Sequence, residues 1–497
     1  MVLKENITVP HFVLFPFISQ GHIIPMIDIA KLLAQHGAIV TIFTTPKNAL
    51  RFSSVLSRAV SSGLQINLVT LNLQSKQAGL PDGCENSDMV NISKDMWNNF
   101  FYAVSLLQEQ AQELFDKLPL KPNCIISDFF IPWTSQIAEK HQIPRISFHG
   151  FSCFCLHLLF KVHSSKILES VNSDTEYFTV PDIPHKIQVN KEQVPGAILD
   201  EGLKETGMKM HEAEMKSYGV IINTFEELEK QYVNDYKKVS SDKVWCVGPV
   251  SLCNKNGLDK AERGKIASIS EHNCLKFLDL HKPKSVVYVC LGSLCNLVSS
   301  QLIELALGLE ATKIPFIWVI RDGLDKTEGL EKWFSGEKFE ERNQGRGFII
   351  RGWAPQMVIL SHPSIGGFLT HCGWNSTLEG ISVGVPMVTW PLFADQFLNE
   401  KLVTQVLRIG VSLGVEVLMK LGEEEKLGVV VKKEVITKTI CNVMDEGDQE
   451  SKERRERVSE LSEIAKKAVE KGGSSYINIT LLIQDIMQLQ PTTKVET

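Results

Sequence analysis

The 497-residue chain lacks the marks of a membrane or secreted protein. No uncharged apolar run reaches the about 18 residues that a transmembrane helix needs. The first residues carry neither the basic region nor the long apolar region of a secretory signal peptide. The 11 cysteines are too sparse for a secreted disulfide scaffold, and none of their spacings matches a zinc site. We therefore expect a cytoplasmic protein with no integral membrane segment.

An excess of basic charge is also missing. The 52 Lys and Arg residues against 58 Asp and Glu residues give a net charge of −6, so no nucleic-acid partner is expected. Hydrophobic residues make up 43% and charged residues 22%, a balance typical of globular proteins and not of disordered ones. The length predicts two domains or three small ones. No sequence feature signals an oligomer, and we expect a monomer.

Three motifs that would indicate other chemistries are absent. The chain has no G-x-G-x-x-G fingerprint, which removes the main support for a nicotinamide oxidoreductase. It has no Walker A sequence, so a P-loop nucleotidase lacks its central group. No D-x-D pair occurs, so a metal-held diphosphate is unsupported and no metal site is expected.

The hydrophobic pattern that is present predicts an α/β fold. Residues 12–18 form an apolar run typical of a buried parallel strand, and Pro25 fits the first turn of a helix that ends at Gly37. Residues 39–44 form the next strand, which completes a βαβ unit. The same reasoning predicts further strands at 66–71, 124–127, 145–148, 220–223, 285–291, 315–321, 347–350, 367–370 and 387–390.

These strands fall into two doubly wound, Rossmann-like domains with parallel sheets. We expect an N-terminal domain over 1–250, a polar linker over 251–275 and a C-terminal domain over 276–475, followed by a last helix within 476–497. Ligands bind beyond the carboxyl ends of parallel strands, so the natural site is a cleft between the two domains.

The 44 residues from Trp353 to Gln396 hold the densest set of candidate ligand groups. A strand at 366–370 leads through His371 and Gly373 into a helix that opens at Trp374. We expect Asn375 or Ser376 at the N-terminus of this helix, where unpaired N–H groups make an anion site. Gly373 would let a phosphate approach closely, and His371 could donate a hydrogen bond to it.

Other residues of this segment suit the remaining parts of a nucleotide sugar. Glu379 lies one turn after Asn375, where its carboxylate could accept both hydroxyls of a ribose. Trp353 could stack on a flat base, and Asp395 with Gln396 could bind sugar hydroxyls. Base, ribose, diphosphate and sugar would thus each have a partner.

The complete segment resembles the nucleotide-sugar signature of the plant family 1 UDP-dependent glycosyltransferases. The opening HFVLFPFISQGHIIPMIDIAKLLA is similar to the N-terminus of these enzymes, as is the strand end Ile126-Ser127-Asp128. The resemblance implies a GT-B fold of two Rossmann-like domains, with the acceptor on the first and the UDP-sugar on the second. It implies that the final helix crosses back to the first domain. It also implies donor contacts from Ser293, Trp353, Ala354, Gln356, His371, Gly373, Trp374, Asn375, Ser376, Glu379, Asp395 and Gln396.

The resemblance identifies His22 as the catalytic base and Asp128 as its partner. An acceptor hydroxyl is a poor nucleophile and needs a base nearby. An aspartate on the other ring nitrogen would fix the tautomer of His22 and stabilise its imidazolium form. The two residues follow different predicted strands, so both could reach the cleft.

These residues predict an inverting O-glucosyltransferase that uses UDP-glucose as donor substrate, with no cofactor. In the family the last signature residue is Gln in glucose enzymes and more often His in galactose enzymes, and here it is Gln396. The segment 79–86 resembles the branch that acts on triterpenoid or steroid sapogenins and flavonoids, so the acceptor would be a small hydrophobic metabolite. Transfer of galactose or glucuronic acid, and a non-catalytic ligand-binding protein, remain the alternatives.

Overall fold

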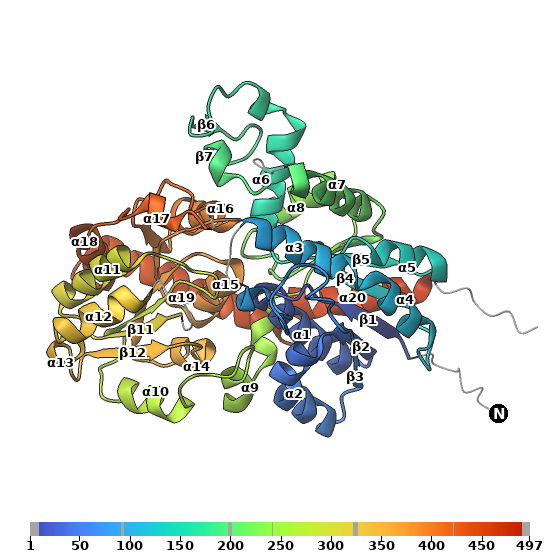
Figure 1. The fold of residues 1–497 in the computed structure, drawn as a ribbon, viewed down its shortest axis with the longest axis horizontal. Helices are drawn as coiled ribbons and strands as arrows, with labels where there is room; N and C mark the ends of the chain where they lie inside the picture. The colour runs from blue at the N-terminus through green and yellow to red at the C-terminus, as the bar shows by residue number, and fades with distance from the viewer. Residues whose placement is uncertain are drawn as a thin grey trace, which may run out of the picture.

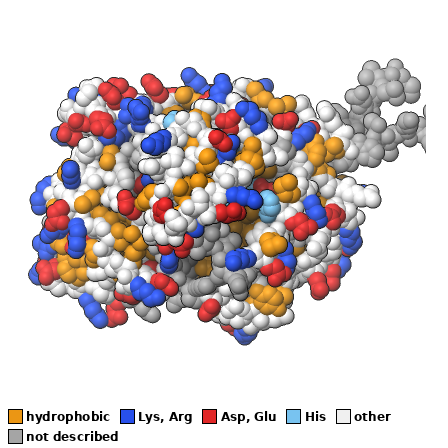
Figure 2. Space-filling model, turned by 90° about the horizontal axis from the view of Figure 1, so that it is seen from above, with side chains coloured by type: hydrophobic (Ala, Val, Ile, Leu, Met, Phe, Trp, Pro, Cys, Tyr) orange, Lys and Arg blue, Asp and Glu red, His pale blue; other side chains and the backbone are white. Residues whose placement is uncertain are grey.

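Two parallel β-sheets flanked by helices form the two halves of the molecule (Figure 1). This computed structural model describes residues 9–90, 94–196, 201–240, 242–321, 327–420 and 422–489. Acidic and basic side chains are interspersed over the face drawn in Figure 2. Among the helices in the described ranges, none is long and apolar enough to cross a membrane.

The first sheet has the order β3-β2-β1-β4-β5-β8-β9, and its neighbouring strands pair in parallel. Its central strands are buried apolar runs, as expected for a sheet covered on both faces. The chain order reverses between β1 and β4, which makes their carboxyl ends the switch point where such sheets bind ligands. The strands are β1 (His11–Phe15), β2 (Ile39–Thr44), β3 (Ile66–Thr70), β4 (Cys124–Asp128), β5 (Arg145–His149), β8 (Gly219–Ile222) and β9 (Val244–Cys246).

The second sheet has the order β12-β11-β10-β13-β14-β15, again with parallel pairs. Its switch point lies between β10 and β13. The two sheets are of the doubly wound kind, which agrees with the predicted α/β class. The strands are β10 (Val286–Cys290), β11 (Phe316–Ile320), β12 (Gly347–Arg351), β13 (Ile365–Thr370), β14 (Met387–Thr389) and β15 (Gly410–Ser412).

Helices cover both sheets, and a short hairpin stands apart at the top of Figure 1. The hairpin pairs β6 (Phe178–Thr179) with β7 (Gln188–Val189). The helices of the first half are α1 (Gln20–Gln35), α2 (Pro46–Ser61), α3 (Lys94–Ser105), α4 (Gln108–Asp116), α5 (Thr134–His141), α6 (Cys153–Ser164), α7 (Glu201–Met215) and α8 (Lys230–Val239).

The later helices surround the second sheet, except for the first and the last of them. They are α9 (Gly257–Ala261), α10 (Glu271–Leu278), α11 (Ser299–Thr312), α12 (Glu328–Gly336), α13 (Phe339–Arg342), α14 (Gln356–Leu360), α15 (Trp374–Val383), α16 (Gln396–Lys401), α17 (Glu424–Leu427), α18 (Lys433–Met444), α19 (Gln449–Val469) and α20 (Ser474–Gln488). The segment 251–275, expected to be a linker, contains α9 and the start of α10. The domain limits drawn from the sequence stay predictions.

The sequence placed the start of α1 wrongly. Pro25 lies in the second turn of the helix, which begins at Gln20, and not in its first turn. The first turn carries Gly21 and His22, so it shows none of the apolar spacing from which a helix is predicted. Strands β9 and β15 were also missed.

The last helix, α20, packs on the first domain and not on the sheet that precedes it in the chain (Figure 1). Its buried side chains Ile479, Leu482 and Ile486 join the core around β1 and β2. Asp485 accepts hydrogen bonds from Nζ of Lys243, the residue before β9, at 2.6 and 2.7 Å. Residues 490–497 of the predicted last helix lie outside the described ones.

We expect Leu482→Ala to lower the free energy of unfolding by about 2–5 kcal/mol, because Leu482 is fully buried and its loss leaves a cavity. Leu481→Ala is the matched control, since this neighbour is 48% exposed and its truncation should change stability by no more than about 0.5 kcal/mol. Urea denaturation of both variants measures the difference. Equal midpoints would show that α20 does not stabilise the fold.

Candidate active site

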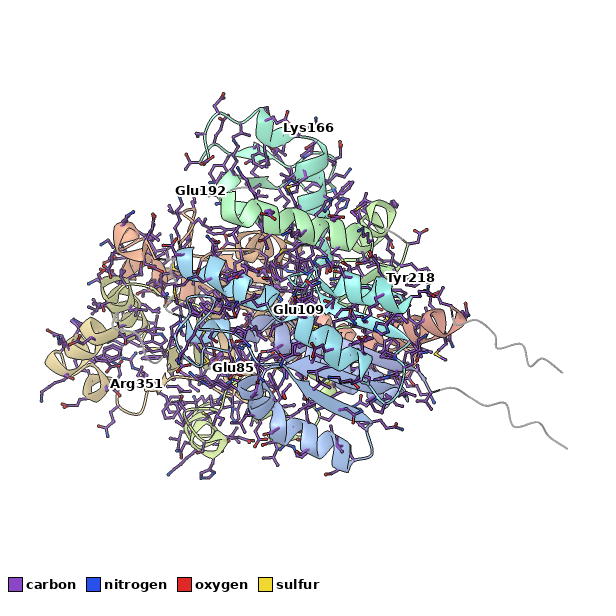
Figure 3. All side chains as sticks on the ribbon, turned by 45° about the vertical axis from the view of Figure 1, so that its right-hand side comes forward. Glu85, Glu109, Lys166, Glu192, Tyr218 and Arg351 are labelled. Carbon is purple, nitrogen blue, oxygen red and sulfur yellow. The ribbon has the colours of Figure 1, made fainter. Side chains whose placement is uncertain are left out.

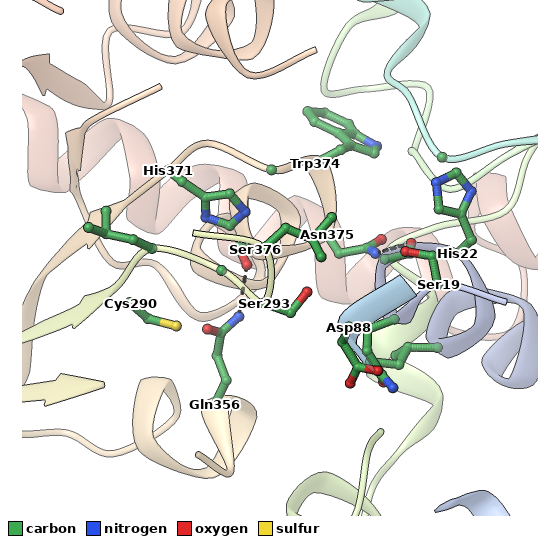
Figure 4. Close-up of a pocket in the computed structure, with 18 of the residues that line it drawn as sticks. Ser19, His22, Asp88, Cys290, Ser293, Gln356, His371, Trp374, Asn375 and Ser376 are labelled. Carbon is green, nitrogen blue, oxygen red and sulfur yellow. Dashed lines mark hydrogen bonds between the residues drawn. The ribbon is translucent and has the colours of Figure 1, made fainter. Parts of the chain in front are cut away.

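A cavity of about 420 Å³ lies between the carboxyl ends of the two sheets and is lined by residues of both halves. Figure 4 shows His22 on one side of it and His371 and Ser293 on the other, with Asn375 between them. Of the fourteen residues predicted for the site, thirteen line this cavity, and Asp128 lies behind His22. Four loops bring the residues of the second domain together, since Ser293, Trp353, His371 and Asp395 follow the carboxyl ends of β10, β12, β13 and β14.

His22 and Asp128 form a hydrogen-bonded pair at the switch point of the first sheet. His22 lies in the first turn of α1, and Asp128 is the last residue of β4, next to β1. Nδ1 of His22 is 2.8 Å from Oδ2 of Asp128, whose other oxygen accepts a hydrogen bond from the backbone N–H of Phe130 at 3.0 Å. Asp128 is buried and His22 is 20% exposed. The ring nitrogen available to a ligand in the cavity is therefore Nε2.

The pair shifts the proton affinity of the imidazole. Burial disfavours the imidazolium form of His22, but the negative charge and hydrogen bond of Asp128 outweigh this effect and raise the pKa of His22. Asp395, across the cavity, adds a smaller attraction. A base that is partly buried and yet easily protonated suits the removal of a proton from a hydroxyl.

Aromatic side chains surround His22 on the side of the first domain. The rings of Phe17 and Phe130 meet the imidazole edge-on, with centroids 5.5 and 5.2 Å away. Trp97 and Phe101, from α3, continue this wall along the cavity. A ligand that reaches Nε2 of His22 must therefore present an apolar body to this wall.

The turn between β13 and α15 forms the opposite wall. The N-cap of α15 is Gly373 and the helix begins at Trp374, so Asn375 and Ser376 lie in its first turn, as the sequence predicted. Residue 373 has to be a glycine, because a Cβ atom there would lie 2.4 Å from Nε2 of His371. The N–H groups of the first turn of α15 still point from the helix end and favour an anion there.

His371 sits in a tight place between two glycines. Gly292, with φ +80°, and Gly373 both leave room for its ring, since a Cβ atom on either would come within 2.5 Å of Nε2. Burial lowers the pKa of His371 to about 4, although the carbonyl of Cys290 opposes the shift. His371 is therefore neutral at pH 7 and has a single N–H to donate, either to the carbonyl of Cys290 or to an anion.

A second group of polar side chains lies between Trp353 and α15. Nε2 of Gln356 donates to Ser376 Oγ at 3.0 Å and to Oε2 of Glu379 at 2.7 Å. The backbone of Trp353 is held by two 2.9 Å hydrogen bonds with Ser268, and Ala354 follows it along the wall. Trp353, expected to stack on the base, and Glu379, expected to bind the ribose, thus line the same cavity.

Asp395 and Gln396 have complementary free groups. Oε1 of Gln396 accepts from the backbone N–H groups of Leu392 and Phe393 at 2.8 and 3.2 Å, which leaves its Nε2 as a donor. Oδ2 of Asp395 accepts from Nδ2 of Asn399 at 2.6 Å, and burial raises the pKa of Asp395 to about 6. The pair offers one donor and one acceptor to neighbouring hydroxyls.

Two of the predicted donor residues also hold the domains together. Nε1 of Trp374 donates to the carbonyl of Asn223 at 2.7 Å, and its ring is buried. Nδ2 of Asn375 donates to the carbonyl of Gly21 at 2.6 Å. That carbonyl is free because Pro25, four residues later, has no N–H to donate to it.

Sequence reasoning missed several residues of the cavity. Lys260, Arg263 and Lys265 line it, although they belong to the polar segment that was taken for a linker. Arg321, at the end of β11, also lines it and donates to Oδ1 of Asn296 at 2.8 Å. No local pattern could have signalled the three residues of the polar segment, because a charged residue in a polar stretch is typical of a solvated surface. Arg351, the last residue of β12, does not line the cavity. It pairs with Glu331 and Glu340 on the outer surface (Figure 3).

Comparisons with known proteins agree with this geometry. A family model described as UDP-glucoronosyl and UDP-glucosyl transferase matches residues 267–445. UDP-glycosyltransferase 73C6 of Arabidopsis thaliana is 55% identical over 489 residues, with 98% of each chain covered. UDP-glycosyltransferase 73C12 of Barbarea vulgaris is 56% identical, with 96% of this chain and 97% of that one covered. The chain belongs to the plant family 1 UDP-glycosyltransferases.

Solved structures of this glycosyltransferase family share the fold. UGT73P12 of Glycyrrhiza uralensis, complexed with glycyrrhetinic acid 3-O-monoglucuronide, matches with a TM-score of 0.88 and 37% identity over 97% of this chain and 96% of that one. UGT71G1 of Medicago truncatula, complexed with UDP-glucose, matches with a TM-score of 0.74 and 25% identity over 96% and 98%. The predicted GT-B fold is confirmed.

Membership of the family makes this protein a glycosyltransferase whose UDP-sugar is a donor substrate and not a cofactor. Across the part of the chain that the structure describes, no three His, Cys, Asp or Glu side chains cluster in a way that could hold a metal ion.

We expect Asp128→Asn to lower the pKa of His22, because the charge that outweighs its burial is removed while the burial stays. An NMR titration of the imidazole signals measures the shift. Asp395→Asn is the control and should lower the pKa less, since Asp395 makes no hydrogen bond to the ring. A pKa that does not change in Asp128→Asn would contradict the assigned electrostatics.

Proposed function

We propose that this glycosyltransferase is an inverting, UDP-glucose-dependent O-glucosyltransferase that acts on a hydroxyl of a small hydrophobic metabolite. One observation carries the proposal: the His22–Asp128 pair shares a cavity with Asp395, Gln396 and His371. A base and its partner thus face groups suited to a sugar and a diphosphate. A protein that only bound a ligand would need neither member of the pair.

The geometry supports a single displacement. Nε2 of His22 takes the proton of the acceptor hydroxyl as its oxygen attacks C1 of the glucose, and Asp128 stabilises the imidazolium that forms. The bond from C1 to the UDP oxygen breaks on the opposite face, which turns an α-linked donor into a β-glucoside. Because the base must be unprotonated, the rate falls as the pH drops below the raised pKa of His22.

The leaving UDP carries negative charge into the second domain. The N-terminus of α15, with Gly373 as its cap, provides N–H groups for the diphosphate, while Ser293 and neutral His371 add side-chain donors. Trp353 would stack on the uracil and Glu379 would accept the ribose hydroxyls. In this proposal the protein itself, without a divalent metal, neutralises the leaving group.

The free groups of Asp395 and Gln396 support glucose as the sugar. A donor from Nε2 of Gln396 and an acceptor from Asp395 can pair with adjacent equatorial hydroxyls. Galactose differs in the direction of one hydroxyl, so one of these buried groups would stay unpaired. UDP-glucose in the relative UGT71G1 is consistent with this choice.

The aromatic wall around His22 supports a hydrophobic acceptor such as a triterpenoid or steroid sapogenin or a flavonoid. Phe17, Trp97, Phe101 and Phe130 offer flat apolar contacts to a ring system. The relative UGT73P12 carries glycyrrhetinic acid 3-O-monoglucuronide, which fits this class. We also propose a cytoplasmic, monomeric enzyme.

We expect His22→Ala to reduce turnover about 10²- to 10⁴-fold, because the general base is lost, while UDP binding stays nearly unchanged. Mass spectrometry of products from UDP-glucose and a panel of aglycones measures turnover, and calorimetry measures UDP binding. His272→Ala, on the exposed side of α10, is the control and should keep full activity. Undiminished turnover of His22→Ala would overturn the base assignment.

We expect UDP-glucose to win a competition with equimolar UDP-galactose and UDP-glucuronate, and the product to be a β-glucoside by NMR coupling. Gln396→Ala should lower the preference for glucose over galactose about tenfold, as expected for one lost hydrogen bond in a buried site. Gln344→Ala, an exposed glutamine, is the control. A dominant galactoside or glucuronide would refute the donor assignment, and an α-linked product would refute single displacement.

A further inference from the structure

Arg263 connects the two halves of the molecule inside the cavity. Its Nη2 donates to Oδ2 of Asp28 in α1 at 2.6 Å, and its Nη1 donates to Oε1 of Glu379 in α15. The side chains of Asp28, Arg263 and Glu379 are 3%, 10% and 7% exposed. A single guanidinium therefore joins the first domain, the interdomain segment and the helix of the second domain, away from bulk water.

The backbone next to Arg263 is shaped to lie against the donor site. Gly264 has a backbone φ of +93°, which residues other than glycine rarely adopt. A Cβ atom there would lie 2.8 Å from Oε1 of Gln20 and 2.9 Å from both Ile24 and the indole of Trp353. The backbone at Gly264 thus packs between α1 and Trp353, the residue expected to stack on the uracil. The side chain of Arg263 extends from there to Glu379.

The hydrogen bonds on Glu379 leave room for two more. An ionised carboxylate has about four acceptor positions. Arg263 takes one on Oε1, and Nε2 of Gln356 takes one on Oε2 at 2.7 Å. One position on each oxygen stays available, which matches the two adjacent hydroxyls of a ribose.

We propose that Arg263 is a positioning residue for the donor: it orients the Glu379 carboxylate so that both oxygens accept the ribose hydroxyls, and it anchors this arrangement to the first domain through Asp28. The inference rests on the proposed role of Glu379 in binding ribose. Arg263 itself acts through Glu379 and does not touch the reacting atoms.

The planar guanidinium suits this role better than an ammonium group. Its two terminal nitrogens point to two different carboxylates at once, whereas the single ammonium of a lysine would have to choose or share. Removing the cation leaves the buried Glu379 without its charge partner, so its orientation towards the ribose is no longer enforced.

Binding of UDP and of 2′-deoxy-UDP, measured by calorimetry, tests the proposal. Wild-type protein should bind UDP about 10- to 100-fold more tightly than 2′-deoxy-UDP, as expected for one hydrogen bond to a charged group. Arg263→Met should lose most of this preference through weaker UDP binding, with a smaller loss for 2′-deoxy-UDP, which keeps only the 3′-hydroxyl. The preference of Arg263→Lys for UDP should lie between those of the wild type and Arg263→Met. The lysine variant replaces the methionine variant if the latter does not fold.

Arg58→Met is the matched control. Arg58 holds the same interdomain segment through Asp259 at 2.8 Å and Glu262 at 2.6 Å, but it does not line the cavity. This variant should keep the full preference for UDP, which separates an effect on Glu379 from general loosening of the segment.

The outcomes separate a failure of the ribose-binding role of Glu379 from a failure of the positioning role of Arg263. If wild-type protein does not prefer UDP, the assignment of Glu379 to the ribose fails. If the preference is present and Glu379→Gln abolishes it, but both Arg263 variants keep it, the role of Arg263 is refuted. An equal loss of both nucleotides in the Arg263 variants would also refute it, because a merely structural role predicts that result.

Discussion

The hydrogen bond between His22 and Asp128 is the interaction around which the site is organised. It joins the first turn of α1 to the end of β4 across the point where the strand order of the first sheet reverses. Because β1 and β4 are neighbours, with Phe15 opposite Ser127, their carboxyl ends open at the same edge. Burial of Asp128 keeps its charge unscreened by water, and this charge decides both the raised pKa of His22 and which ring nitrogen faces the ligand.

A dyad on one domain is useful only if the other domain is held at a fixed distance from it. The signature of the second domain provides part of this connection, since Trp374 and Asn375 bond to the carbonyls of Asn223 and Gly21. Pro25 contributes indirectly, because it leaves the Gly21 carbonyl without a helical partner. Trp374 and Asn375 therefore belong both to the predicted donor site and to the contact between the two domains.

Local patterns predicted most of the fold because central parallel strands must be continuous apolar runs. The predicted strands at 39–44, 124–127 and 285–291 differ from β2, β4 and β10 by at most a residue or two at either end. The start of α1 was predicted too late, because its first turn carries Gly21 and His22 and shows no apolar pattern. Strands β9 and β15 were missed, although the equally short β14 was predicted.

The sequence by itself determined the two α/β halves, the family signature and the identity of the residues that line the cavity from the strand ends. These features depend on short stretches of chain, where hydrophobic runs and turns are visible. The tertiary structure alone decided that His22 meets Asp128, that Gln396 has only its amide nitrogen free, and that Arg263 reaches Glu379. Such contacts join residues more than a hundred positions apart or depend on which atoms are already bonded, and no local periodicity encodes either.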